Sequence, residues 1–148
     1  MEPLLSNPAF RTYAFCSAIL AFKMLYSAIH TGQTRSRHQG YINAEDASVF
    51  GPAGSAAAEL EHPAVAHALR IQRNDLESIP LFFIVGLLFV LTGGSPWWTW
   101  LYCWTYTLTR LAHTFFYQHH MQPHRAISFV IGTSATVLMA LRVFWTTL

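Results

Sequence analysis

Four apolar stretches, each long enough to cross a lipid bilayer, constrain this chain more than any other feature of its sequence. They cover approximately residues 9–29, 63–91, 97–117 and 125–145. Charged residues make up only 11% of the chain, compared with roughly 25% in an average soluble domain. The pattern predicts an all-α integral membrane protein, in which a four-helix bundle forms one domain over residues 1–148. Such a small unit has a thin core, which favours oligomerisation.

The segments between the apolar stretches predict how the helices are connected and oriented. A long polar connection occupies residues 31–62, a tight turn occupies residues 92–96, and Pro80 is expected to kink the second helix. Arginines gather around the first and third connections, which places these connections in the cytoplasm by the positive-inside rule. The six are Arg35, Arg37, Arg70, Arg73, Arg110 and Arg125, against Arg11 and Arg142 on the opposite side.

Two groups of polar residues interrupt the apolar stretches and predict a polar pocket between helices. Within each group the residues recur at spacings of three, four and seven, so each group shares one helix face. An unpaired charge in hydrocarbon costs several kcal/mol, and charged residues at membrane depth are functional by default. The predicted pocket comprises Arg70, Arg73, Asn74, Glu77, Arg110, His113 and Tyr117, with Arg125 opening the fourth helix and Arg35 just past the end of the first.

The charges of this pocket predict the class of its ligand. Four or five guanidinium groups and one carboxylate, that of Glu77, suit a small molecule that is anionic overall but carries an ammonium group. A structural alternative remains for one pair, because Arg73 and Glu77 are four residues apart and can pair along the helix. For the whole set, the cations outnumber the carboxylate, which favours a ligand.

Four strings of residues carry a resemblance that covers nearly the entire chain. They are Thr31-Gly-Gln-Thr-Arg35-Ser-Arg37, Glu45-Asp46-Ala47, Arg70-x-x-Arg73-Asn74-Asp75-x-Glu77 and Arg110-x-Ala-His113-Thr-x-x-Tyr117. In order and spacing they resemble the membrane-associated proteins in eicosanoid and glutathione metabolism, the MAPEG family. The resemblance implies a homotrimer of four-helix subunits that binds glutathione between neighbouring subunits near the cytosolic side. The implied glutathione contacts are Arg35, Arg73, Asn74, Glu77, His113, Tyr117 and Arg125, with Arg70 and Arg110 as supporting residues.

The resemblance also implies an activity. We expect a glutathione-dependent transferase or peroxidase, with a hydrophobic electrophile or lipid hydroperoxide entering from the bilayer. Arg125 is the implied catalytic residue, because a guanidinium near sulfur lowers a thiol pKa that is about 8.5 in the free state. Asp46 is a second implied catalytic residue, which either positions Arg125 or transfers a proton. Alternatively, Asp46 is an ordinary solvated carboxylate of the loop. We expect the protein to lie in a bacterial inner membrane or in the membrane of the endoplasmic reticulum.

Two positions depart from the pattern of the family's prostaglandin isomerase. That branch carries a Ser directly after the fourth-helix arginine and a Tyr three residues further on, where this chain has Ala126 and Phe129. Both hydroxyl groups are therefore missing. Two alternatives to the transferase or peroxidase remain: a prostaglandin isomerase, and a non-catalytic glutathione-binding membrane module.

The remaining residues predict neither a metal site nor nucleic-acid binding. His119, His120 and His124 lie in a turn with no Cys or carboxylate at ligand spacing, which favours interfacial histidines over a metal site. The net charge of +2 comes without a basic run. Cys16 and Cys103 fall in apolar stretches and are expected to be inert core thiols.

Overall fold

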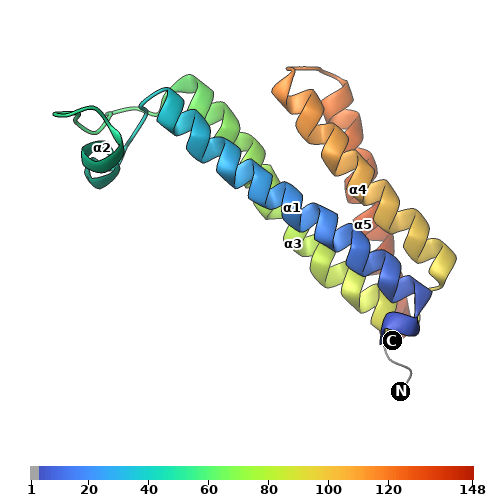
Figure 1. Cartoon of the computed structure of the whole chain (residues 1–148). Helices are drawn as coiled ribbons and strands as arrows, with labels where there is room; N and C mark the ends of the chain where they lie inside the picture. The colour runs from blue at the N-terminus through green and yellow to red at the C-terminus, as the bar shows by residue number, and fades with distance from the viewer. Residues whose placement is uncertain (1–3) are drawn as a thin grey trace. The chain divides into compact units, whose positions relative to one another are not determined.

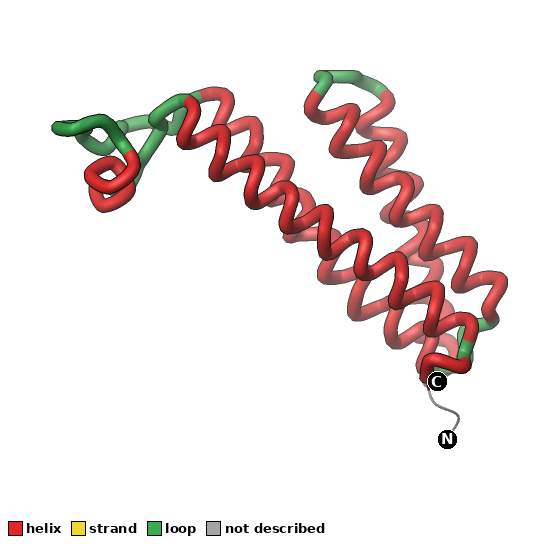
Figure 2. Tube along the Cα trace, viewed as in Figure 1, coloured by secondary structure: helices red, strands yellow, loops and turns green. Residues whose placement is uncertain are grey.

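The computed structural model describes residues 4–148, and every regular element in this range is helical. The elements are a 3-10 helix η1 (Leu4–Ser6) and the α-helices α1 (Pro8–Arg37), α2 (Ala44–Phe50), α3 (Pro63–Leu91), α4 (Pro96–Gln118) and α5 (His124–Thr147) (Figure 1). Figure 2 shows the same trace with helices separated by short loops, apart from the segment around α2. The predicted all-α class is confirmed.

Three of the long helices, α1, α3 and α5, are long and apolar enough to cross a membrane. This supports an integral membrane protein. The fourth long helix, α4, has 23 residues, but its buried face is largely polar, so its composition alone does not mark it as a span. Its buried residues are Thr99, Cys103, Tyr106, Thr107, Arg110, His113 and Thr114. The four-span arrangement stays a prediction.

The turn between α3 and α4 forms where the sequence predicts it. Gly93 has a φ of +84°, in the left-handed region that favours glycine. The Ser95 hydroxyl oxygen then caps α4 by accepting a hydrogen bond from the Trp98 backbone N–H at 3.5 Å, with Pro96 in the first turn of the helix. These residues fix where α4 begins.

The first helix ends later than predicted. It continues to Arg37, so Arg35 lies in its last turn rather than just past its end. The Thr31 hydroxyl donates to the Ser27 carbonyl at 2.9 Å, which satisfies this polar side chain within the helix. Apolar composition marks the membrane-embedded part of a helix, whereas backbone hydrogen bonding continues into the polar residues that follow. The connection between α1 and α3 is therefore shorter than predicted. It also contains a helix, α2, that was not predicted.

The chain divides into two compact units. Unit 1 contains the described residues up to Lys23 together with Glu77–Leu148, and unit 2 contains Met24–Leu76. Unit 1 therefore holds the first half of α1, the second half of α3, and all of α4 and α5. Unit 2 holds the second half of α1, α2 and the first half of α3.

Aromatic side chains join the helices of unit 1. The Tyr13 hydroxyl on α1 donates to the Phe83 carbonyl on α3 at 2.8 Å. The Phe82 ring on α3 stacks on the Tyr106 ring of α4, with centroids 4.2 Å apart. Phe82 and Tyr106 are both almost completely buried. Large flat rings thus fill the space between these three helix segments.

A glycine allows α5 to pack closely against α4. A Cβ atom at Gly132 would lie 2.6 Å from the Thr109 hydroxyl oxygen, closer than any real contact allows. That hydroxyl donates to the Thr105 carbonyl at 2.7 Å and is held in place by its own helix. Gly132 is therefore required by the close approach of the two helices rather than by its backbone conformation.

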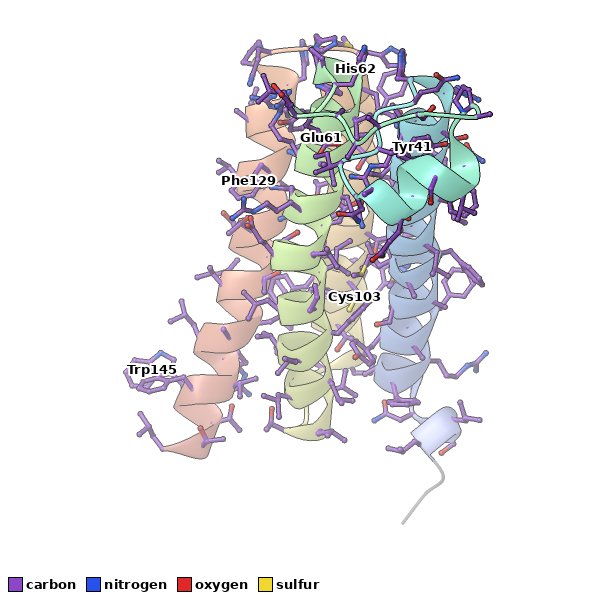
Figure 3. The ribbon with its side chains drawn as sticks, turned by 90° about the vertical axis from the view of Figure 1, so that its left-hand side faces the viewer. Tyr41, Glu61, His62, Cys103, Phe129 and Trp145 are labelled. Atoms are coloured by element: carbon purple, nitrogen blue, oxygen red, sulfur yellow. The ribbon has the colours of Figure 1, made fainter. Side chains whose placement is uncertain are left out.

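Polar contacts organise unit 2. The Ser27 hydroxyl on α1 donates to Oδ2 of Asp75 on α3 at 2.6 Å, and both residues are buried. Tyr41, labelled in Figure 3, is also buried, and its carbonyl accepts a hydrogen bond from the Ala58 N–H at 2.8 Å. The loop that contains α2 is thereby tied back to the segment that leaves α1.

Candidate functional site

Five side chains from α4 and α5 gather in unit 1, and we call them the α4–α5 cluster: Arg110, His113, Tyr117, Arg125 and Phe129. The Arg125 guanidinium carbon lies 4.4 Å from the centroid of the Tyr117 ring. The His113 ring lies 5.8 Å from the Tyr117 ring and 6.1 Å from the Phe129 ring, which Figure 3 labels on α5. The structure thus brings together four residues of the predicted site, and only Phe129 lies outside that set.

Within this cluster, the Arg110 side chain is buried and is held by contacts with neighbouring side chains. It is 1% exposed, and its guanidinium carbon lies 5.1 Å from the ring centroids of both Tyr106 and Phe129. Its Nη2 donates to the Thr133 hydroxyl at 3.4 Å. A guanidinium between two ring faces is stabilised by their quadrupoles. Arg110 is therefore a buried, packed member of the cluster rather than a solvent-facing one.

Arg125 is placed differently. It lies in the first turn of α5, is only partly buried, and rests on the face of the Tyr117 ring. This arrangement keeps a permanent positive charge over an aromatic ring at a partly exposed position. The pair can stabilise negative charge that develops on a bound molecule.

The predicted polar face of α3 points away from the packed interior of the chain. We call these residues the α3 stripe: Arg70, Arg73, Asn74 and Glu77. Asn74 is half-buried and the other three are exposed, whereas Ile71, Asp75 and Ile79 form the buried face of the same helix. The stripe thus presents cationic and anionic groups along one outward face, as the spacing predicts.

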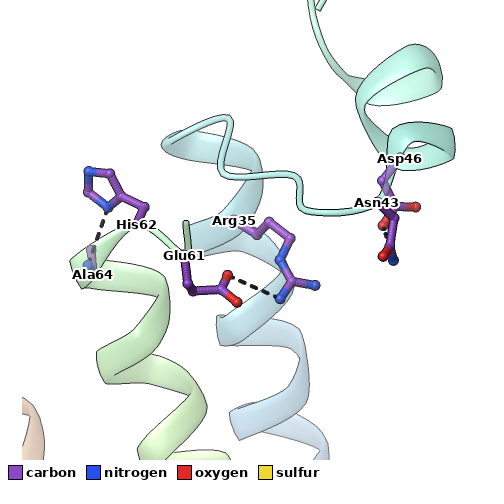
Figure 4. Close-up of polar contacts among 6 residues, drawn as sticks. All are labelled: Arg35, Asn43, Asp46, Glu61, His62 and Ala64. Carbon is purple, nitrogen blue, oxygen red and sulfur yellow. Dashed lines mark hydrogen bonds and ion pairs between the residues drawn. The ribbon is translucent and has the colours of Figure 1, made fainter. Parts of the chain in front are cut away.

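Two further predicted site residues, Arg35 and Asp46, lie in unit 2 (Figure 4). Arg35 Nη2 donates to Oε1 of Glu61 at 3.3 Å, and the two side chains are 29% and 22% exposed. Asp46 lies in the first turn of α2, where its Oδ2 accepts a hydrogen bond from the Asn43 amide at 3.3 Å. Because Arg125 belongs to unit 1, the suggested positioning of Arg125 by Asp46 stays a prediction.

Sequence reasoning missed the buried hydrogen bond between Ser27 and Asp75. Asp75 is 1% exposed and lies four residues from both Ile71 and Ile79, on the buried face of α3. That spacing was the available signal, because a carboxylate on an apolar stripe needs a hydrogen-bond partner. Nothing in the first helix distinguishes Ser27 as that partner. Glu61, which pairs with Arg35, was missed because it lies in an irregular segment without periodicity.

The histidines and cysteines add no metal centre to this picture. Within residues 4–148, no group of three or more His, Cys, Asp or Glu side chains is placed to hold a metal ion. Cys16 and Cys103 are both buried free thiols. His119 packs its ring against Phe115, with centroids 4.4 Å apart.

Known proteins are similar to this chain over nearly its whole length. The sequence profile of the MAPEG family matches residues 13–145. Prostaglandin E synthase from Homo sapiens is 32% identical over 143 residues, which cover 96% of this chain and 92% of that protein. The protein of the same name from Rattus norvegicus is 33% identical over 134 residues, with coverages of 90% and 86%. Microsomal glutathione S-transferase 1 from Homo sapiens is 31% identical over 144 residues, with coverages of 96% and 93%.

Proposed function

Because this chain belongs to the MAPEG family, we propose that it is a glutathione-dependent membrane transferase or peroxidase that acts on hydrophobic electrophiles or lipid hydroperoxides. The family predicted from the sequence motifs is confirmed. The name of one relative, microsomal glutathione S-transferase 1, supports glutathione as the reactant. The site charges support it independently, since glutathione carries two carboxylates and one ammonium group.

The α3 stripe fits the charged groups of glutathione. Arg73, together with Arg35 in the last turn of α1, binds the carboxylates through charge-assisted hydrogen bonds. Glu77 binds the ammonium group. Further contacts come from Asn74, His113 and Tyr117, while Arg70 and Arg110 support the pocket. The exposure of Arg70, Arg73 and Glu77 supports this assignment, because these side chains are not buried by the chain itself.

One observation carries the chemical part of the proposal: the Arg125 guanidinium lies 4.4 Å from the Tyr117 ring at a partly exposed position. When bound, glutathione supplies a thiolate nucleophile for an electrophilic carbon or a peroxide oxygen. Arg125 stabilises the negative charge at the sulfur position and so favours the ionised thiol. Tyr117, whose ring lies against Arg125, is proposed to donate a hydrogen bond from its hydroxyl group to the bound molecule.

The assembly proposed for this function is a homotrimer of four-span subunits, with each glutathione site between neighbours on the cytosolic side. Two observations support it. The α3 stripe faces away from the interior of its own chain, so a neighbouring subunit can cover it. The arginines around the first and third connections favour the cytosol for that end by the positive-inside rule.

A prostaglandin isomerase is the second candidate, and the relatives named prostaglandin E synthase support it. Against it stand Ala126 and Phe129, which offer no hydroxyl group. The Phe129 ring contacts Arg110 and His113. An apolar ring therefore lies in the cluster at the position where the isomerase pattern has a Tyr. A non-catalytic glutathione-binding module is the third candidate.

Turnover and binding together test the proposal. Purified protein in detergent micelles is incubated with glutathione and either a chromogenic aryl chloride or an organic hydroperoxide, and glutathione binding is measured by calorimetry. We expect turnover with at least one of the two substrates. Binding without turnover identifies the non-catalytic module, and isomerisation of a prostaglandin endoperoxide as the sole activity identifies the second candidate.

A matched pair of variants locates the site. Arg73→Ala removes a charge-assisted contact worth about 1.5–3 kcal/mol, which weakens glutathione binding roughly ten- to a hundredfold. Arg37→Ala removes an exposed arginine at the end of α1 that has no role in the proposed site, and it should leave the affinity unchanged. Equal affinities for the parent, Arg73→Ala and Glu77→Ala would exclude the α3 stripe as the glutathione site.

A further inference from the structure

Two aromatic-lined cavities lie in unit 1, and their lining residues come from the beginning of α1, the beginning of α4, the end of α3 and the last turns of α5. The first has a volume of about 440 Å³ and is lined by Pro8, Arg11, Thr12, Phe15, Trp100 and Trp104. The second has a volume of about 400 Å³ and is lined by Phe89, Gly93, Ser95, Trp98, Tyr102 and Arg142. Each cavity contains a single arginine, and neither has an acidic lining residue.

The two cavities flank opposite faces of α4. Trp100 and Trp104 are four residues apart and share one face, and Trp98 and Tyr102 share another. A shift of two residues turns a helix by roughly 200°, so the two faces are nearly opposite. Between them runs the fully buried side of α4 at this end, which contains Cys103. The aromatic pairs therefore line cavities instead of the helix-packing interface.

The aromatic walls of both cavities are ordered by contacts among the rings. In the first cavity the Phe15 and Trp104 rings lie 5.9 Å apart. In the second, Tyr102 stacks on Trp98 at 5.6 Å and meets Phe89 edge-on. Each arginine thus lies beside a preformed apolar surface.

The charged side chains at this end are all positive among the described residues of unit 1. Glu77 is the one acidic side chain in that part of the chain, and it lies 12 residues before Phe89 on α3, about 18 Å along the helix axis. The Arg142 guanidinium donates through Nη1 to the Thr146 hydroxyl at 3.0 Å, which leaves its remaining N–H donors for other acceptors. An anionic group is therefore the natural partner for Arg11 and Arg142.

We propose that these two cavities are binding sites for bilayer phospholipids, with Arg11 and Arg142 each holding a phosphodiester group. Guanidinium forks match phosphate oxygens through two parallel hydrogen bonds. Trp and Tyr side chains concentrate at the headgroup level of membranes, where one end of the ring system is apolar and the other is wet. The rings provide the wall for the glycerol and the first carbons of the acyl chains.

These sites are separate from the α4–α5 cluster and independent of the proposed enzymatic function. Trp104 precedes Tyr117 by 13 residues on α4, about 20 Å along the helix. The chemistry also differs, because the cavities lack a carboxylate that would bind an ammonium group. Loss of these lipids should therefore not abolish glutathione binding.

Native mass spectrometry of protein released from phosphatidylglycerol-containing nanodiscs tests the proposal. The parent protein should retain phospholipid adducts. The double variant Arg11→Gln/Arg142→Gln should need about tenfold more lipid for the same adduct occupancy and should release its adducts at lower collision energy, since each site loses a charge-assisted contact. Arg37→Gln, at the other end of α1, is the matched control and should retain the adducts.

Two further arms identify what is recognised. In detergent, added phospholipid should raise the unfolding temperature of the parent more than that of the double variant, whereas diacylglycerol, which lacks phosphate, should raise both equally. Soluble glycerophosphate should give no shift, because the rings need the acyl-bearing part of the lipid. Equal adduct retention by the parent and the double variant, an equal response to phospholipid, or a full response to glycerophosphate would each overturn the proposal.

Discussion

Arg125 is the residue on which binding and chemistry should separate. If its main contact forms with the charged sulfur, Arg125→Ala loses an interaction made only as the thiolate develops, so kcat falls on the order of a hundredfold while glutathione affinity changes little. Steady-state kinetics together with the ultraviolet absorbance of the bound thiolate measure both effects. Arg125→Lys keeps the charge but loses the contact of the guanidinium group with the Tyr117 ring, and its activity should be intermediate.

Full activity in Arg125→Ala would contradict this role and would point to Tyr117, the side chain in direct contact with it. Restoring the missing hydroxyl with Ala126→Ser should change the rate only modestly if Arg125 is sufficient. A large gain in prostaglandin isomerisation by that variant would instead show that the hydroxyl, and not the arginine, limits the chemistry.

The hydrogen bond between Ser27 and Asp75 predicts a stability effect at a position with no proposed catalytic role. Ser27→Ala removes the donor and leaves a buried carboxylate oxygen without that partner, so the free energy of unfolding should fall by about 1–3 kcal/mol. Thermal unfolding in detergent measures the change. Ser36→Ala, an exposed position on the same helix, is the control. Equal unfolding temperatures for the two variants would show that the contact contributes nothing.

At the scale of residues, the sequence predicted which polar side chains share a helix face, but it did not predict which residues of other segments they contact. The spacing of Arg110, His113 and Tyr117 predicted their common face, and that face is present on α4. Their meeting with Arg125 depends on how α5 packs on α4, which a helix pattern does not encode. The Arg35 contact with Glu61 depends on the path of an irregular segment, for which the sequence has no periodic signal.

At the scale of elements, the packing of α5 on α4 predicts the effect of a single methyl group. Gly132→Ala places a Cβ 2.6 Å from the Thr109 hydroxyl, which its own helix holds, so the helices must separate at a cost of about 1–3 kcal/mol. Thr109→Ala in the same chain removes the obstacle and should restore most of the stability. Chemical or thermal unfolding in micelles measures both variants.

A second glycine provides the control for this experiment. Gly32 lies inside α1 and has nothing within 4 Å of the position of a Cβ atom. Gly32→Ala should therefore be neutral or stabilising, by up to about 1 kcal/mol from helix propensity. Additive losses in the Gly132→Ala/Thr109→Ala double variant would contradict the packing explanation, because independent sites add and neighbours in contact do not.

The helices show which structural signals are strong in this sequence. The bounds of α3 match the predicted stretch at residues 63–91, because Pro63 starts the helix and the glycines after Leu91 end it. The predicted end of α1 was eight residues too early. Polar residues mark where a helix leaves the hydrocarbon core of the bilayer, but the helix itself can continue beyond that point. Helix α2 was missed, because its seven residues are too short for a periodic pattern.

At the scale of the whole molecule, the thin core of a small helical subunit, together with its membership of the MAPEG family, predicts assembly. Protein purified in mild detergent should be a trimer of about 50 kDa polypeptide mass, three times the 16.7 kDa chain. Native mass spectrometry at micromolar concentration measures the state. A monomer that binds glutathione with full affinity would rule out a site completed by a neighbouring subunit.

The length of α1 has a consequence for topology. With 30 residues the helix is about 45 Å long, compared with roughly 30 Å of hydrocarbon, so its last turns reach water unless it is strongly tilted. The loop at residues 51–58 is then exposed to water on one side of the membrane only. A protease added to sealed vesicles of known orientation should cut there once, leaving α1 in one fragment and α3–α5 in the other, both retained in the lipid. Vesicles that resist the protease in one orientation and yield in the other would report the sidedness of the native chain without any tag.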